Sequence, residues 1–429
     1  MTRIVRFVPA ALASQRGLSL IELMVALVLS LLLMLGLVEI FGSTRAAFGA
    51  SSGLARAQEN SRFALDFLRR DTRMAGHLGC LNEFGQIAVP EQRFYNHLIV
   101  AGAAFTTATS PLRIDAPIQV YEFTGSTPGT TYTIAAPAVA TDGSGWSPAL
   151  PTGATQLNVI KAGTGGIIPG SDVLVVRYFD EAPLTLSVGA TSTTTWPLGQ
   201  GGVNAPAGTV YTGPNSPSVV LNAVYGVTNC KSASMFQVTS TAATTVGSNG
   251  GGNQPNPTGG TVYWDPREVF GIGSMMFRYR AVAYYVGLGA NGGPSLFRLS
   301  LPDTPGSTAA GIRFATTPEE IVEGVELMQI LLATAAVPSA TGRVDDVTGY
   351  QSVTTLLTGA ADEAARVTAL RRVASVRVSL LLRSPDPGAG VNPVSPTKVV
   401  GDVTVTPPLD QRIRHVYDSM ILLRNRQRA

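Results

Sequence analysis

The sequence predicts an α+β protein in which one long N-terminal helix precedes a β-rich region with large loops. An uncharged aliphatic run near the N-terminus is followed by a stretch in which apolar residues recur every three or four positions, which is typical of a helix. The rest of the chain holds short β-branched segments separated by stretches rich in Gly, Pro, Thr and Ser. The 46 Gly and 28 Pro among 429 residues agree with a loop-rich domain.

The first element is an apolar helix over residues 18–38. Residues 23–38 carry no charge, and only Ser30 and Gly36 interrupt the aliphatic side chains. At about 1.5 Å per residue, the run roughly matches the ~30 Å hydrocarbon core of a bilayer. Glu22 lies near its start, where an ionised acid in a membrane costs on the order of 2.5 kcal/mol or more. We therefore expect a membrane-spanning helix in which Glu22 has a specific role.

The residues before this helix form, together with Glu22, a recognisable pattern. The leader, residues 1–17, carries arginines and no acid, ends in Gly17, and is followed by Leu18 and then by Glu22. This pattern resembles the class III signal of type IV prepilins and pseudopilins. The resemblance implies cleavage by a prepilin peptidase between Gly17 and Leu18 and N-methylation of Leu18. Phe is more frequent in this family at the position of Leu18.

Two other interpretations of the N-terminal segment stay open. A secretory signal has an apolar core of roughly 7–15 residues followed by a small-residue cleavage site, whereas here the core is longer and the Gly-ended basic flank precedes it. A plain single-span anchor would explain the length and, through the positive-inside rule, the preceding arginines. It would explain neither Gly17 nor Glu22.

Glu22 is predicted to act in assembly. Packing of apolar helices in a filament would exclude water from its carboxylate, and a buried unpaired charge costs on the order of 3–5 kcal/mol. No Lys or Arg occurs between Arg16 and Arg45, so the cation within reach is the free amine of Leu18, on the same chain or on a neighbour. We expect Glu22 to set subunit register and to be dispensable for cleavage and for folding of the exported domain.

The chain has two cysteines, Cys80 and Cys230. The arginines before the span place the N-terminus in the cytoplasm and the later residues on the oxidising side. A disulfide between them is therefore expected, with two free buried thiols or a metal site as the alternatives. Metal ligation is disfavoured because only His77, His97 and His415 are available, without metal-ligand spacing.

The second half of the long helix is predicted to pack against a domain. Its apolar stripe comprises Leu54, Ala57, Ser61, Ala64, Leu68 and Ala75, widened by Phe63, Leu65 and Phe67. The chain then divides into a leader (1–17), a membrane-spanning helix (18–38), its amphipathic continuation (39–79, with a doubtful joint at 49–53) and a β-rich exported domain (80–429, with a sub-boundary near 248–260).

The exported domain is predicted to be mainly β. Strands are expected at 171–178, 219–225, 233–239, 276–287, 295–299, 376–383 and 416–423, with loops and short strands over 81–169, a helix at 362–373 and a loop at 384–408. Residues 318–332 could begin as a helix, but a strand at 325–331 is favoured. The alternation in 376–383 predicts a strand with one buried face.

Five strings in these elements, at 58–65, 71–80, 321–326, 375–381 and 423–426, together resemble the PilW family, the large minor pilins of type IV pilus assembly. The resemblance implies a pilin-like fold, in which the N-terminal helix packs on an antiparallel sheet with large insertions. It also implies priming or capping of the pilus, and thereby twitching motility. The implied partners are the prepilin peptidase, other minor pilins, the major pilin, the assembly platform and the inner membrane. The protein would cross that membrane once, with its bulk in the periplasm.

Other function classes find less support in the sequence. The formal charge of +3 comes from 31 basic and 28 acidic residues, and removing the three leader arginines leaves 28 of each, so no nucleic-acid partner is expected. No nucleophile elbow, metal-ligand cluster or recognisable carboxylate pair is present, so neither an enzyme nor a cofactor is expected. The alternatives are the J-type minor pseudopilin of type II secretion, which is usually much shorter, and a tip adhesin or DNA receptor using the terminal arginines 424, 426 and 428.

Overall fold

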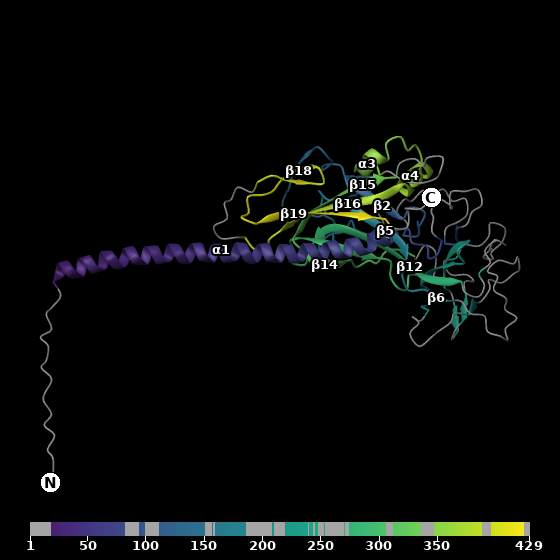
Figure 1. Cartoon of the computed structure of the whole chain (residues 1–429), viewed down its shortest axis with the longest axis horizontal. Coiled ribbons are helices and arrows are strands. Elements are labelled where there is room, and N and C mark those ends of the chain that lie inside the picture. Colours follow the sequence, from purple (N-terminus) through teal and green to yellow (C-terminus); the bar gives the residue numbers. More distant parts are fainter. Residues whose placement is uncertain are drawn as a thin grey trace, which may run out of the picture.

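The structure is a computed structural model that describes residues 19–81, 94–98, 111–150, 157, 159–185, 208–209, 219–238, 240–242, 245–247, 253, 270, 274–305, 312–335, 347–387 and 396–423. Within these ranges a single helix of 55 residues projects from a β-rich domain (Figure 1). The predicted α+β class is confirmed. The predicted sub-boundary near 248–260 lies almost entirely outside the described residues.

The helix α1 runs without interruption from Leu20 to Met74. The joint expected at 49–53 is therefore wrong, although its glycines do weaken a helix by about 1 kcal/mol each. At Gly53 the reason is packing, because a Cβ there would come within 3.1 Å of the Cβ of Ser384. The predicted stripe is confirmed for Ala57, Ala64 and Leu68, which are buried against the domain.

Two aromatic residues of the predicted stripe face solvent instead. Phe63 is 55% exposed and Phe67 is 36% exposed, whereas Leu65 between them is buried. The helix thus buries a narrower face than its composition indicated, because successive residues are about 100° apart and only one stripe can meet the sheets.

The largest sheet contains ten of the described strands, along the order β1-β9-β8-β12-β5-β2-β4, with β13 and β6 pairing β12 and β14 pairing β13. Its strands are β1 (Phe94–Asn96), β2 (Ile118–Phe123), β4 (Trp146–Ser147), β5 (Val173–Phe179), β6 (Leu184–Thr185), β8 (Val224–Thr228), β9 (Ala233–Gln237), β12 (Met275–Leu288), β13 (Pro294–Ser300) and β14 (Glu319–Glu323). The strands predicted at 276–287 and 295–299 are confirmed as β12 and β13, which pair antiparallel. All pairs in this sheet are antiparallel except β1 with β9.

Three smaller sheets complete the described domain. They consist of β15 (Val325–Thr334), β16 (Val373–Arg383) and β19 (Arg414–Leu422), then of β3 (Thr131–Thr133), β17 (Lys398–Val400) and β18 (Val403–Thr406), and lastly of β7 (Gly208–Thr209), β10 (Ser240–Ala242) and β11 (Thr245–Gly247). Short helices α3 (Val353–Leu356) and α4 (Glu363–Arg371) join β15 to β16. The strand favoured at 325–331 and the helix expected at 362–373 are both confirmed.

In the sheet β15-β16-β19, the strands β15 and β16 are covered on both faces. Val376, Val378, Leu380 and Leu382 join the core that α1 covers, while Leu327 and Leu381 on the other face pack against Val400, Val403 and Val405. The prediction of a half-buried strand at 376–383 is therefore wrong, and so is the loop at 384–408, which contains β17 and β18. The two errors have one cause, since the short strands missed in the Pro- and Gly-rich segment cover the second face.

The strand expected at 219–225 begins later than predicted, at Val224. Asn222 adopts a φ of 63°, a conformation that interrupts an extended strand, and its N–H donates to Val238 O at 2.8 Å. The segment before Val224 is thus a turn next to β9. The β5 and β19 strands lie within two residues of their predicted bounds.

Candidate assembly site

The N-terminal end of α1 is closed by Ser19 and Glu22. The Glu22 N–H donates to Ser19 Oγ at 3.2 Å, and the Ser19 N–H donates to Glu22 Oε2 at 3.3 Å. This reciprocal pair is a capping box, which satisfies two backbone donors that the helix leaves free. It places the Glu22 carboxylate beside the backbone of Ser19, one residue from Leu18. Gly17 and Leu18 themselves lie outside the described residues.

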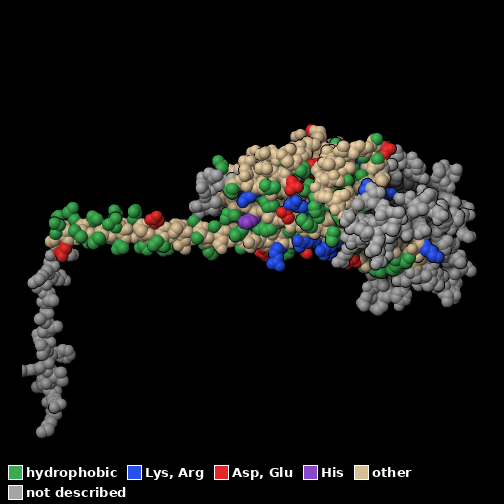
Figure 2. Space-filling view, turned by 45° about the horizontal axis from the view of Figure 1, so that its top comes forward, with side chains coloured by type: hydrophobic (Ala, Val, Ile, Leu, Met, Phe, Trp, Pro, Cys, Tyr) green, Lys and Arg blue, Asp and Glu red, His purple; other side chains and the backbone are tan. Residues whose placement is uncertain are grey.

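The first part of α1 presents apolar side chains on every side. Among the described helices, α1 alone is long and apolar enough to cross a membrane. Its most apolar 18-residue stretch has a mean hydropathy of 2.7, and the domain buries none of this stretch. Figure 2 shows hydrophobic side chains along the visible face of the protruding part of α1. A helix that is apolar all round requires an apolar environment, which a bilayer or a bundle of similar helices supplies.

The second part of α1 is attached to the domain through a buried carboxylate, Asp71. Its Oδ1 accepts a hydrogen bond from Tyr178 Oη at 2.8 Å, and its Oδ2 accepts from Tyr284 Oη at 2.6 Å and from Arg298 Nη2 at 3.1 Å. Burial, reinforced by Asp71, raises the pKa of both tyrosines, so they remain donors. These contacts fix the helix to β5, β12 and β13. Sequence analysis missed this role, and the signal was an acid within the apolar stripe, three residues after Leu68.

The end of α1 is also held by a disulfide bond. Cys80 and Cys230 are joined with an S–S distance of 2.00 Å, across a sequence separation of 150 residues. The bond connects the segment after the helix to the turn between β8 and β9. The predicted disulfide is confirmed, and the alternatives of free thiols and a metal site are overturned for these two residues.

The three histidines named as conceivable ligands are not brought together. His77 Nδ1 lies 2.8 Å from Phe179 O, His97 follows β1, and the His415 ring lies 6.0 Å from that of Tyr417. In the part of the chain that the structure describes, no group of three His, Cys, Asp or Glu side chains could hold a metal ion.

A protruding apolar helix that is capped by an acid at its start and fixed to a β-rich domain defines a pilin-like protein with a single membrane anchor. Residues 12–38 match the family model of the prokaryotic N-terminal methylation motif, which includes Gly17, Leu18 and Glu22. Residues 283–425 match the family model of PilW, the type IV pilus-assembly protein W. The chain thus carries a prepilin-type motif at one end and a PilW domain at the other.

The PilW match runs from the middle of β12 through β19. It therefore contains the strings at 321–326 and 375–381. The helix strings at 58–65 and 71–80 lie outside both matched regions. No curated protein and no solved structure matches the chain. Both matched families describe pilus components and not enzymes.

Proposed function

We propose that the protein is a minor pilin that, together with other minor pilins, primes or caps type IV pilus assembly and so supports twitching motility. The observation that carries the proposal is the presence of a prepilin-type motif and a PilW match in one chain, with an unbroken helix that runs from the motif to the β-rich domain. The helix supplies the apolar surface that a filament core needs, and the domain remains outside that core.

The proposal assigns a sequence of events to the N-terminal segment. A prepilin peptidase removes residues 1–17, and the new N-terminus at Leu18 is methylated. Residues 18–38 span the inner membrane and later enter the filament, while residues 39–79 continue the helix to the domain formed by 80–429 on the periplasmic side. The exposed first part of α1 supports this division, because none of its most apolar window is buried by the domain.

Glu22 is proposed to guide assembly by pairing with the amine of Leu18. In the capping box, Glu22 Oε2 accepts from the Ser19 N–H at 3.3 Å, and Ser19 is the residue that follows Leu18 in the chain, which supports a pair within one chain. In a filament, the same carboxylate can instead meet the amine of a neighbouring subunit. Such a pair, buried among apolar helices, rejects any register that leaves the charge unpaired.

The test is deletion of the gene, scored for surface pili and for secretion of type II substrates in the same strain. A minor pilin predicts loss of pili with normal secretion, and reintroduction of the wild-type gene should restore piliation. Loss of secretion with normal pili would replace the proposal by a J-type minor pseudopilin.

A further inference from the structure

A cavity of about 310 Å³ lies next to the outer covering of the β15-β16 sheet. This volume is at the lower end of the range for small-molecule sites, which are mostly apolar with a few polar groups. The apolar lining includes Tyr132, Ile134, Ile168, Pro169 and Pro408, and the charged lining comprises Glu326, Arg383 and Asp410.

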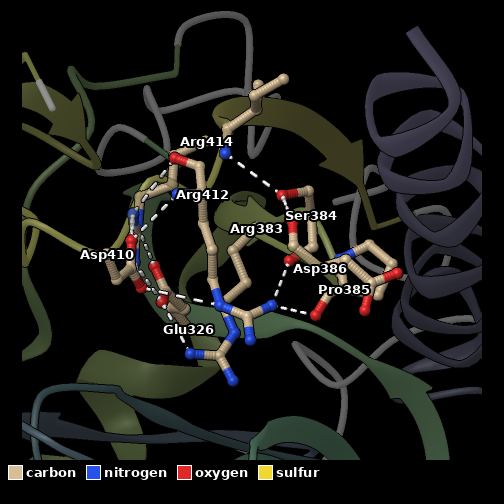
Figure 3. A network of polar contacts seen from close by, with 9 residues as sticks. Glu326, Arg383, Ser384, Pro385, Asp386, Asp410, Arg412 and Arg414 are labelled. Carbon is tan, nitrogen blue, oxygen red and sulfur yellow. Dashed lines mark hydrogen bonds and ion pairs between the residues drawn. The ribbon is translucent and has the colours of Figure 1, made fainter. Parts of the chain in front are cut away.

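Both acids of the cavity make their shortest contacts with one arginine, Arg414, which is 3% exposed. Arg414 donates to Glu326 from Nε at 2.6 Å and from Nη2 at 2.9 Å. It also donates to Asp410 from Nη1 and Nη2, both at 2.7 Å (Figure 3). Two-pronged contacts of this kind are strong, so both carboxylates are neutralised within the protein.

Arg383 is paired far less well. Its guanidinium makes one long contact among the described residues, from Nη1 to Glu326 Oε1 at 3.4 Å, although its side chain is only 16% exposed. A guanidinium has five N–H donors, and buried donors are normally satisfied. Glu326 is thus the one described acid in contact with Arg383, and the other donors of this guanidinium have no described side-chain partner.

The charged side chains around the cavity also carry a net positive charge. Arg412 donates from Nη1 to the carbonyl oxygens of Ser384, at 2.7 Å, and Pro385, and its Nε lies 3.7 Å from Asp410 Oδ2. Asp386 lies on the surface, 84% exposed and 3.9 Å from Arg56. Around the cavity, three arginines therefore face two acids. Burial lowers the pKa of Arg383, Glu326 opposes this, and Arg412 and Arg414 add to the lowering.

We propose that this cavity binds a small organic carboxylate, whose carboxylate pairs with Arg383 and whose apolar body packs between Tyr132 and the proline walls. An anion supplies the charge and the acceptors that Arg383 lacks, and it is a better fit than a cation because Arg414 already occupies both acids. The rigid apolar walls favour an aromatic or short aliphatic body. This proposal does not depend on the pilus role.

The test uses the full chain in lipid nanodiscs with 4-fluorobenzoate as the probe, followed by ¹⁹F NMR. Saturable binding at ~1 mM or below is expected, after subtraction of empty nanodiscs. The neutral 4-fluorobenzamide should bind at least about 10-fold more weakly, because it lacks the charge that pairs with Arg383. Absence of saturable binding by the wild-type chain, or equal binding of the amide, would overturn the proposal.

Two variants locate the site. Arg383→Met should weaken 4-fluorobenzoate binding about 10-fold or more, whereas Arg377→Met, on the same strand but outside the cavity, should not change it. Ala138→Phe fills the cavity from an exposed position of its lining loop, so it should abolish binding without unfolding the domain. Wild-type affinity in Ala138→Phe would overturn the assignment, even if Arg383→Met failed to fold.

Discussion

Asp71 on α1 accepts a 2.6 Å hydrogen bond from Tyr284 on β12, and this contact joins the helix to the centre of the largest sheet. The same carboxylate receives Tyr178 from β5 and Arg298 from β13. Three strands thereby converge on one side chain of the helix. The apolar stripe alone does not fix the rotation or the axial position of α1 on the domain, whereas these directed hydrogen bonds do.

Replacement of Asp71 should therefore be costly. Asp71→Ala leaves Arg298 and two tyrosines without their shared acceptor, and we expect the free energy of unfolding to fall by about 3–5 kcal/mol. Urea denaturation followed by tryptophan fluorescence measures this. The matched control is Asp66→Ala on the exposed face of the same helix, for which a change within about 0.5 kcal/mol is expected. Similar small changes for both variants would show that the Asp71 cluster does not anchor the helix.

The disulfide should contribute to the stability of the domain. In the chain-entropy model, closing a loop of this length is worth ~5 kcal/mol, and less where the unfolded chain is already compact. Cys80→Ser should therefore give a protein that is cleaved faster by trypsin than the wild type under identical conditions. Peptide mapping without reduction should recover Cys80 and Cys230 in one linked pair. Two alkylatable thiols in the folded, unreduced protein would contradict the bond.

Stability should fall steeply at alkaline pH. Burial raises the pKa of Tyr178, Tyr279, Tyr284 and Tyr285, whereas an unfolded tyrosine titrates near ~10. Below that pH both states are protonated. Above it only the unfolded state ionises, so each buried tyrosine removes about 1.4 kcal/mol of stability per pH unit. Denaturation midpoints measured from neutral pH upward should show this slope, and Tyr285→Phe should reduce it. A flat profile above pH ~10 would contradict the burial.

Processing should follow the N-terminal motif. N-terminal sequencing of the membrane-bound protein should find methylated Leu18 as the first residue. Gly17→Ala should be processed poorly, and bulkier residues at position 17 should not be processed. A chain that still begins at Met1, or one cut near Ala47, would rule out the prepilin signal.

Much of the fold follows from local pattern. The helix α1, the β12–β13 hairpin and the strands β15, β16 and β19 are long and strongly patterned, so their residues carry enough signal to be placed. The joint expected in α1 was wrong. Glycine lowers helix stability, but at Gly53 the close packing against Ser384 offsets this loss. The short strands β17 and β18 pair with each other in a Pro- and Gly-rich segment, and β18 also pairs with β3, some 270 residues earlier in the chain.

The site was partly predictable for a similar reason. Glu22 and the two cysteines stand out in the sequence itself. Glu22 is an acid within an apolar run, and the chain has only two cysteines. Asp71 does not stand out, since its role depends on tyrosines more than 100 residues away that the fold brings to it. The capping box at Ser19 is a local pattern that sequence analysis could have found, because Ser followed by Glu three residues later is its signature.

The most direct test of the account is surface piliation of a deletion strain that expresses the Glu22→Leu protein, beside strains that express the wild type and Glu39→Leu. Glu39 is the matched control, because it is also an exposed acid on the protruding part of α1. We expect the Glu22→Leu protein to be cleaved at Gly17 and held in the membrane, yet to restore no pili and to capture no other minor pilins, whereas Glu39→Leu should restore pili. Full piliation by the Glu22→Leu protein would contradict the pairing of Glu22 with the N-terminal amine and its role in assembly.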